Sequence, residues 1–171
     1  SNQIFWSLTL QVVRTAQELG YTEPDPRDDL NGMDFSRKML ILGREIGLPL
    51  EMSNVNIKDF LPEACLKAES IPAFYEELEK HEPYFSSFKN EAENSGRKLR
   101  LIGVLEDGKI NIEVQIVDAN HPFFGLSGSD NIISFTTSRY KNTPLVVKGP
   151  GAGAEVTAAG VFADLVRVTA Q

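Results

Sequence analysis

The spacing of apolar residues changes once along this chain, and this change constrains the fold more than any other feature. In the first half, apolar residues recur every three to four positions, which predicts helices over residues 5–19, 32–46 and 72–95. Pro83 has no backbone amide to donate, so we expect it to divide the last of these segments into two helices. The stretch 48–70 follows neither period, and we expect it to be irregular apart from one helical turn near Leu61–Leu66.

In the second half, apolar and polar residues alternate, as they do in half-buried strands. Leu99–Leu105 and Ile110–Val117 flank Asp107-Gly108, the dipeptide that a tight primed turn favours, so we predict a hairpin. Three further elements are expected: strands at Ile132–Thr137 and Leu145–Lys148, and a helix from about Glu155 to Val168. Helices followed by strands are typical of an α+β fold, here with a mixed or antiparallel sheet that helices cover on one face.

Charge and composition exclude several classes of protein. The 171 residues include 17 basic and 24 acidic side chains, a net charge of −7, which is the wrong sign for a nucleic-acid binder. The apolar run 152–170 contains Glu155, Asp164 and Arg167, which would be costly in lipid, so no membrane partner is expected. Cys65 is the single cysteine and cannot form an internal disulfide, which favours a reducing compartment such as the cytoplasm.

The segment Gly20–Lys38, GYTEPDPRDDLNGMDFSRK, gathers five carboxylates among three basic side chains. Its two prolines favour an ordered loop over residues 21–31 and not a helix. Asp34 and Lys38 are four positions apart and share a face of the following helix. One interpretation is an ordinary exposed ion pair worth about 0.3–0.5 kcal/mol. The other is a lysine that transfers a proton while carboxylates hold a cationic substrate group.

A second segment, Lys148–Thr157, contains the glycine-rich turn Gly149–Gly153 between a strand and a helix. Free amides and the helix dipole at such a point can bind an anion. The spacing Gly-x-Gly-x-Gly is not the dinucleotide fingerprint Gly-x-Gly-x-x-Gly, and no Gly-Lys-Ser/Thr follows, which excludes a P-loop. The segment is therefore either an anion-binding turn or a tight turn that lets the last helix pack closely.

Several segments together resemble the homoserine dehydrogenase family. The segment from Gly20 to Lys38 resembles the family's signature, and Asp130–Ile133, Pro144–Val147 and Gly149–Asp164 are similar to the same family. The resemblance covers nearly the whole chain and is strongest to the bifunctional aspartokinase–homoserine dehydrogenases. The family interconverts L-homoserine and L-aspartate 4-semialdehyde with NAD or NADP, in the biosynthesis of threonine, methionine and isoleucine.

The resemblance implies roles for seven residues, none of them a metal ligand. Lys38 matches the family's general acid and base. The others match residues of the substrate and cofactor sites: Glu23 and Asp34 as carboxylates that bind homoserine, Asp29 and Tyr21 as lining of the same pocket, and Gly151 and Gly153 as the turn that contacts the nicotinamide cofactor. 

The mechanism that this resemblance implies depends on the charge state of Lys38. In oxidation, neutral Lys38 takes the hydroxyl proton as hydride leaves for the nicotinamide; in reduction, its ammonium protonates the alkoxide. Glu23 suits the ammonium of homoserine. A carboxylate that contacts an ammonium favours the charged form. We therefore expect Asp34 to face the substrate and not to pair tightly with Lys38.

The resemblance also implies a larger enzyme. The family has a Rossmann nucleotide-binding domain, a second lysine and a monovalent-cation site upstream of the catalytic part, and these 171 residues contain none of them. We therefore expect a covalently linked nucleotide-binding domain upstream. Residues 1–148 would be the catalytic domain, which binds substrate and dimerises through its sheet, and 149–171 a turn and helix that pack on the absent domain. Alone, the chain is expected to be inactive.

Some properties lie outside what these residues determine. The choice between NAD and NADP, a fusion to an aspartokinase and allosteric regulation all depend on other parts of such an enzyme. The segment from Phe5 to Gly20 is also shorter than the resemblance leads us to expect. The alternative function, from another class, is a ligand-binding or dimerisation module that keeps the fold without catalysis.

Overall fold

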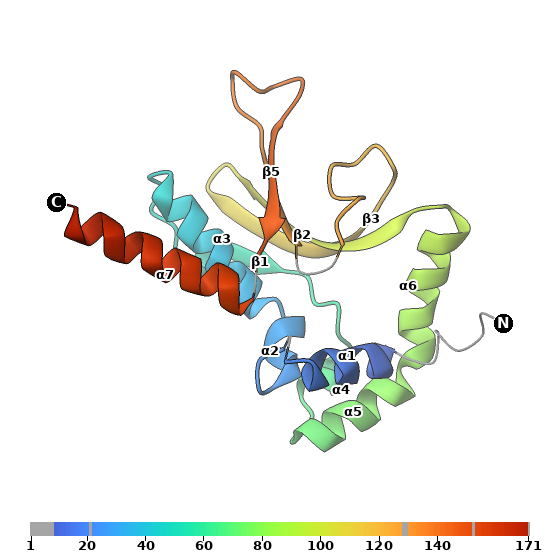
Figure 1. The fold of residues 1–171 in the computed structure, drawn as a ribbon. Coiled ribbons are helices and arrows are strands. Elements are labelled where there is room, and N and C mark those ends of the chain that lie inside the picture. The colour runs from blue at the N-terminus through green and yellow to red at the C-terminus, as the bar shows by residue number, and fades with distance from the viewer. Residues whose placement is uncertain (1–8, 21, 128–129, 152, 171) are drawn as a thin grey trace. The chain divides into compact units, whose positions relative to one another are not determined.

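The computed structural model describes the chain except for residues 1–8, 21, 128–129, 152 and 171 (Figure 1). The chain divides into two compact units, Ser1–Ile116 and Val117–Gln171, and each is described by itself. The first unit holds α1 (Thr9–Glu18), α2 (Pro26–Leu30), α3 (Met33–Glu45), a short 3-10 turn (Met52–Asn54), β1 (Val55–Ile57), α4 (Glu63–Leu66), α5 (Ile71–Lys80), α6 (Glu82–Asn94), β2 (Lys98–Glu106) and β3, which runs from Lys109 to Val117.

A helical core holds one part of the first unit together. Figure 1 shows α1, α2, α4 and α5 close to one another, and Cys65, Phe74 and Leu78 are completely buried among them. The Ser70 hydroxyl accepts a hydrogen bond from the Ala73 amide and so begins α5, while α6 begins just after His81. The expected division of 72–95 into two helices is therefore confirmed.

A second core lies between α3 and the sheet. Leu40 of α3 is buried with Leu50, Ile110 and Ile112. A Cβ added at Gly103 of β2 would lie 2.8 Å from the Phe35 ring, so the absence of a side chain there lets α3 approach the strand. One side of α3 therefore packs on the sheet, while Asp34 and Lys38 are exposed to solvent on the same helix.

The sheet of the first unit has the strand order β1-β3-β2. The turn between β2 and β3 has φ of 49° at Asp107 and 71° at Gly108, the two positive values that a tight primed turn needs, so the predicted hairpin is confirmed. β1 runs parallel to β3, with Val55 opposite Ile110 and Ile57 opposite Ile112. β1 was not predicted, because three residues are too few to establish an alternating pattern.

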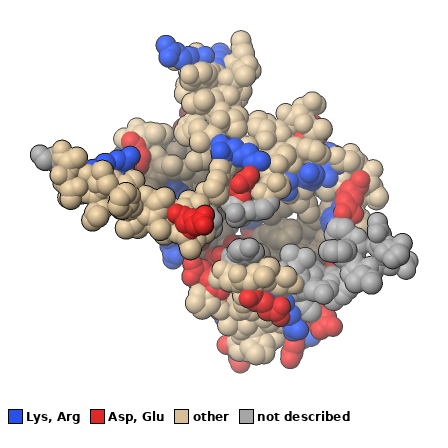
Figure 2. Space-filling model, in the orientation of Figure 1, with Lys and Arg blue, Asp and Glu red and all other residues tan. Residues whose placement is uncertain are grey.

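The second unit contains an antiparallel ladder and a long helix. β4 (Asp130–Phe135) pairs with β5 (Leu145–Pro150), and α7 (Ala154–Thr169) follows. The predicted strands and helix are confirmed to within two or three residues. Every residue of α7 is exposed, and its only charged residues are Glu155, Asp164 and Arg167, so Figure 2 shows few charged atoms along it. Together the two units form the expected α+β architecture of helices with mixed and antiparallel sheets. No helix in the described part of the chain is long and apolar enough to cross a membrane.

Candidate active site

The acidic segment predicted as a loop contains a short helix, α2. The Asp25 carboxylate accepts a hydrogen bond from the Arg27 amide at 3.0 Å, and Pro26 is buried at the first helical position. A proline is favourable there because the first amides of a helix have no partner within it. The expectation of a non-helical segment over 21–31 is therefore wrong. Its prolines were interpreted as helix breakers, but Pro26 begins a helix that Asp25 caps.

α2 brings two of the predicted substrate residues together. The Glu23 amide donates a hydrogen bond of 2.8 Å to Oδ2 of Asp29. Asp29 lies in the second half of α2, and Glu23 lies just before the helix with an exposed side chain. The Asp29 carboxylate thus fixes the backbone from which the Glu23 carboxylate projects into solvent. Tyr21, the fourth predicted substrate residue, lies outside the described residues.

Gly32 sets the start of α3. Its φ of 75° is in the left-handed region, and a Cβ there would lie 3.1 Å from Cγ2 of Ile57. A side chain would therefore meet both backbone strain and crowding at this position. The Asn31 side chain accepts a hydrogen bond from the Met33 amide at 2.8 Å. Asp34 consequently falls in the first turn of α3, where the helix dipole favours a carboxylate, and Lys38 falls one turn later.

Asp34 and Lys38 form an ion pair. Nζ of Lys38 lies 2.6 Å from Oδ2 of Asp34, and the two side chains are 58% and 41% exposed. The expectation that they would not pair tightly is therefore wrong. Side chains four positions apart on a helix are neighbours, and with both open to solvent they close on each other. The pair is worth about 0.2–1 kcal/mol, weak enough for a ligand to open it.

The structure therefore arranges the predicted residues of the first unit as two local pairs. Glu23 and Asp29 form one around α2, and Asp34 and Lys38 form the other on α3. In the part of the chain that the structure describes, no hydrogen bond or ion pair joins one pair directly to the other. α2 packs against α3 through the short connection at Asn31–Gly32, which keeps both pairs in one segment.

The predicted cofactor glycines belong to the second unit. A Cβ at Gly151 would lie 2.0 Å from Nδ2 of Asn131, so this glycine lets the chain pass close to β4. Gly153 precedes α7 with φ of 131°, a conformation that other residues rarely adopt. Each glycine thus has a local conformational reason to be there. The tight-turn interpretation also expected the last helix to pack closely, and that part is wrong, because every residue of α7 is exposed. The role of the turn toward a cofactor is proposed below.

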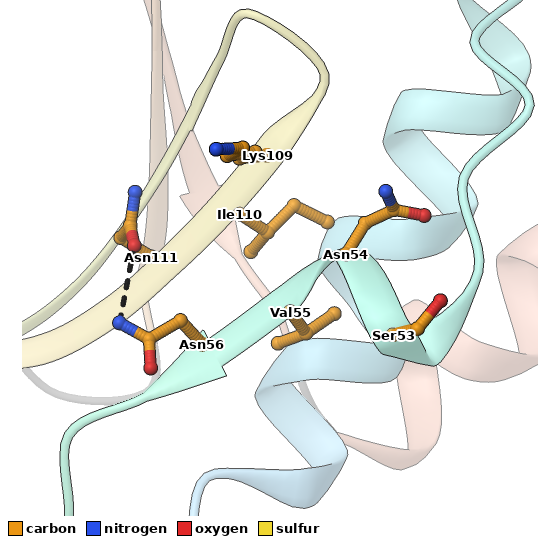
Figure 3. Close-up of a pocket in the computed structure, with 7 residues that line it drawn as sticks. All are labelled: Ser53, Asn54, Val55, Asn56, Lys109, Ile110 and Asn111. Atoms are coloured by element: carbon orange, nitrogen blue, oxygen red, sulfur yellow. Dashed lines mark hydrogen bonds between the residues drawn. The ribbon is translucent and has the colours of Figure 1, made fainter.

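A hollow of about 160 Å³ lies elsewhere, beside β1 and β3 (Figure 3). Four of its seven lining residues carry an amide or hydroxyl side chain, and the Asn56 side chain donates to that of Asn111 at 3.3 Å. The lining residues are Ser53, Asn54, Val55, Asn56, Lys109, Ile110 and Asn111, so it includes none of the residues predicted for substrate. The described residues contain no group of three or more His, Cys, Asp or Glu side chains arranged to hold a metal ion.

Arg27 is the residue near the site that sequence reasoning missed. Its guanidinium contacts the Asp25 carboxylate on one side and the Ala68 carbonyl on the other. The hydrogen bonds from Arg27 hold the pKa of Asp25 below its ordinary value, and the same pairing raises the pKa of Arg27. The contact with Ala68 spans 41 positions, so no local pattern in the sequence could have indicated it.

The comparisons with known proteins identify the family. A sequence model of the homoserine dehydrogenase family matches residues 6–166, and the chain therefore belongs to that family. It is 48% identical over 160 residues to a chloroplastic bifunctional aspartokinase/homoserine dehydrogenase of Zea mays, covering 92% of this chain and 17% of that protein. It is 45% identical to the homoserine dehydrogenase of Schizosaccharomyces pombe, covering 94% of this chain and 43% of that enzyme. The resemblance stated from the sequence is confirmed.

Solved structures share the fold. A Candida auris protein of unknown function is 39% identical with a TM-score of 0.85, covering 96% of this chain and 47% of that one. A hyperthermophilic archaeal homoserine dehydrogenase in complex with NADPH has a TM-score of 0.60 at 23% identity, covering 93% and 39%. At that identity the likeness concerns the fold alone. The chain spans less than half the length of the proteins that it matches.

Proposed function

We propose that this chain is the catalytic part of an NAD(P)-dependent homoserine dehydrogenase, which interconverts L-homoserine and L-aspartate 4-semialdehyde. Membership of the family supports this, and one observation carries it. Four of the residues that the resemblance assigns to the reaction form two carboxylate-containing pairs, Glu23 and Asp29 just before and on α2, and Asp34 and Lys38 in the first half of α3. Lys38, the assigned acid and base, is exposed on α3 and already in contact with a carboxylate.

Lys38 would transfer the proton at the substrate oxygen. The ammonium of Lys38, which contacts Asp34, is the form that protonates an alkoxide during reduction of the aldehyde. For oxidation, Lys38 would leave Asp34 and release a proton to solvent, and its neutral amine would then accept the proton of the homoserine hydroxyl. Opening this exposed pair costs little, so the pair is compatible with both directions.

Glu23 would bind the ammonium group of homoserine. Its carboxylate is exposed, and its backbone is fixed by the hydrogen bond to Asp29, so a cation can approach without the loop having to order first. Asp29 and Tyr21 would complete this part of the pocket. Asp29 would act chiefly through the Glu23 amide, since one of its oxygens is already used there.

The nicotinamide cofactor, NAD or NADP, would be held mainly by a nucleotide-binding domain in the remainder of the protein. When bound, the cofactor supplies the hydride chemistry. Gly151 and Gly153 would let the backbone approach it at the start of α7, and α7 would pack on that domain. This keeps the proposed division into 1–148 and 149–171. The relatives are longer chains, and the Zea mays relative is a bifunctional aspartokinase/homoserine dehydrogenase, so an aspartokinase fused upstream is compatible with this proposal.

A homodimer through the three-stranded sheet and a cytoplasmic location complete the proposal. α3 covers one face of the sheet, and the opposite face carries the Asn56–Asn111 hydrogen bond and an ion pair between Lys58 and Glu113. These polar groups would need matching hydrogen bonds from the partner copy. Light scattering of the full-length protein at micromolar concentration is expected to give the mass of two chains.

The main test is Lys38→Ala in the full-length protein. Loss of a positioned acid and base lowers kcat by about 10²–10⁴, with a much smaller change in the KM for homoserine. Lys67→Ala is the matched control, because Lys67 forms the same kind of exposed i,i+4 ion pair with Glu63 on α4. A Lys38→Ala variant that kept more than about a tenth of wild-type kcat would contradict the assignment.

Glu23→Gln separates binding from chemistry. It preserves the shape of the side chain but removes the charge that faces the substrate ammonium, so KM for homoserine rises more than kcat falls. If the wild-type protein bound homoserine without oxidising it in the presence of either cofactor, the alternative function would hold. The chain would then be a ligand-binding module of the same fold.

A further inference from the structure

Arg27 bridges two parts of the first unit. Its Nε lies 2.9 and 3.0 Å from the two oxygens of Asp25, and its Nη2 also contacts that carboxylate. Its Nη1 donates to the carbonyl oxygen of Ala68, between α4 and α5. The Arg27 and Asp25 side chains are only 21% and 29% exposed, so this bridge is better shielded from solvent than the Asp34–Lys38 pair.

The far end of the bridge is a rigid anchor. Ala68 packs against the helical core that contains Cys65, Phe74 and Leu78, all of them completely buried. The near end is Asp25, which caps α2 two residues after Glu23. Arg27 thus connects the backbone that presents Glu23 to the best-packed part of the first unit.

A second contact holds the same segment from the other side. The Gln17 side chain of α1 donates to the Pro24 carbonyl at 3.3 Å, and the Tyr75 hydroxyl donates to the oxygen of that glutamine at 2.5 Å. The two residues after Glu23 are therefore both held: the Pro24 carbonyl by Gln17 of α1, and the Asp25 carboxylate by Arg27. The amide of Glu23 itself is held by Asp29. Of these contacts, only the one between Arg27 and Asp25 is an ion pair.

We propose that Arg27 is a positioning residue of the substrate site: by joining Asp25 to the Ala68 carbonyl, it fixes the loop that presents Glu23 to the substrate. The inference takes homoserine as the substrate from the proposed function, whereas the bridge itself is observed in the structure. Arginine suits the role because its planar group donates in two directions at once, whereas lysine offers a single ammonium. Arg27 touches no substrate group and acts only through the position of Glu23.

Arg44 offers a matched control within the same unit. It forms the same type of bridge, with Nε donating to the Leu50 carbonyl at 2.8 Å and Nη2 to Glu51 at 2.9 Å. It lies at the end of α3, and among the described residues no hydrogen bond or ion pair joins it to the loop before α2. Loss of Arg44 therefore removes a comparable bridge without changing the support of Glu23.

The experiment compares Arg27→Met, Arg27→Lys and Arg44→Met in the full-length protein with homoserine and either cofactor. Arg27→Met is expected to raise KM for homoserine about tenfold or more, with kcat within about threefold of wild type. Arg27→Lys should recover at most part of this loss, and Arg44→Met should leave KM for homoserine unchanged. An unchanged KM in Arg27→Met, full recovery with lysine or an equal effect in Arg44→Met would overturn the proposal.

Hydrogen exchange of the Glu23 amide provides a readout that does not need activity. Its bond to Asp29 should open more often without the bridge, so exchange is expected to rise about tenfold in Arg27→Met and Arg27→Lys but not in Arg44→Met. Unchanged protection would overturn the positioning role. If Arg27→Met did not fold, Arg27→Lys would decide the matter by the same measurement. A wild-type protein that does not oxidise homoserine would defeat the proposed function, while the exchange result would still decide the role of Arg27.

Discussion

Helices α5 and α7 differ in where their apolar side chains go. α5 has ten residues and buries Phe74, Tyr75 and Leu78 against the rest of the first unit. α7 has sixteen residues and a more apolar composition, yet none of its side chains is buried, and Phe162 is 65% exposed. The more hydrophobic helix is thus the one without a covering surface.

This difference indicates which parts of the chain are complete in themselves. An amphipathic helix buries its apolar side within its own unit, whereas a helix that is apolar on most sides needs a covering surface on most sides. Such a face is expected to be covered in the functional protein. The first unit therefore contains what it needs to position the candidate substrate residues. α7 would be completed by the proposed nucleotide-binding domain.

The largest expected effect comes from removing that domain. The 171-residue chain alone should fold but show no measurable homoserine oxidation, because substrate and hydride donor are not held together, and proximity accounts for about 7–11 kcal/mol of the barrier. Calorimetric titration should give a millimolar or weaker affinity for NAD and NADP. Low-micromolar binding of either cofactor would break the contrast between the two regions, since it would place the cofactor site within this chain.

A pair of phenylalanine truncations tests the contrast directly. In the 171-residue chain, Phe74→Ala should lower the free energy of unfolding by about 3–5 kcal/mol, because it empties a completely buried site. Phe162→Ala should change it by no more than about 0.5 kcal/mol, because the ring is largely exposed. Urea unfolding measures both. In the full-length protein, Phe162→Ala should become clearly destabilising, and an equally small effect there would count against the packing proposed for α7.

The smallest effect concerns Asp25 and pH. The hydrogen bonds from Arg27 hold the pKa of Asp25 below its ordinary value of 3.8, so the folded state binds this proton less readily than the unfolded state. The resulting stabilisation, about 1 kcal/mol, is present above about pH 4 and is lost as the pH falls through the lowered pKa. Urea unfolding at about pH 7 and about pH 2.5 should show that acidification lowers the free energy of unfolding less in Asp25→Asn than in wild type. Asp164→Asn is the control, because Asp164 pairs with Arg167 on exposed α7; an equal flattening there would refute the assignment.

Local features could be predicted from the sequence because neighbours along the chain determine them. The Asp107–Gly108 hairpin, the break between α5 and α6 and the glycine that ends α1 all follow from backbone preferences of a few residues. The spacing of Asp34 and Lys38 likewise predicted that they share a face of α3. The seven site residues came from the resemblance, and their roles stay predictions.

Other features depend on contacts between distant residues, and these only the tertiary structure decided. Pro26 was mistaken for a helix breaker, since the Asp25 cap that makes it a first helical residue depends on the geometry of the whole turn. Leu42 of α3 and Ile46 just after it are exposed, because the helix packs through Leu40 and the small residues at 36 and 43. β1 exists only because β3 pairs with it, 55 positions away.

Arg27 shows both what the sequence determines and what only packing determines. The sequence determined that a charged, proline-containing segment precedes a helix with a lysine on it, because composition and spacing are properties of the chain itself. It could not determine that Arg27 reaches the carbonyl of Ala68, because that oxygen carries no side-chain signal and comes within reach only after α4 and α5 have packed. A backbone group that becomes a partner through packing is invisible to any pattern of residue types, and for that reason the support of Glu23 was decided by the tertiary structure alone.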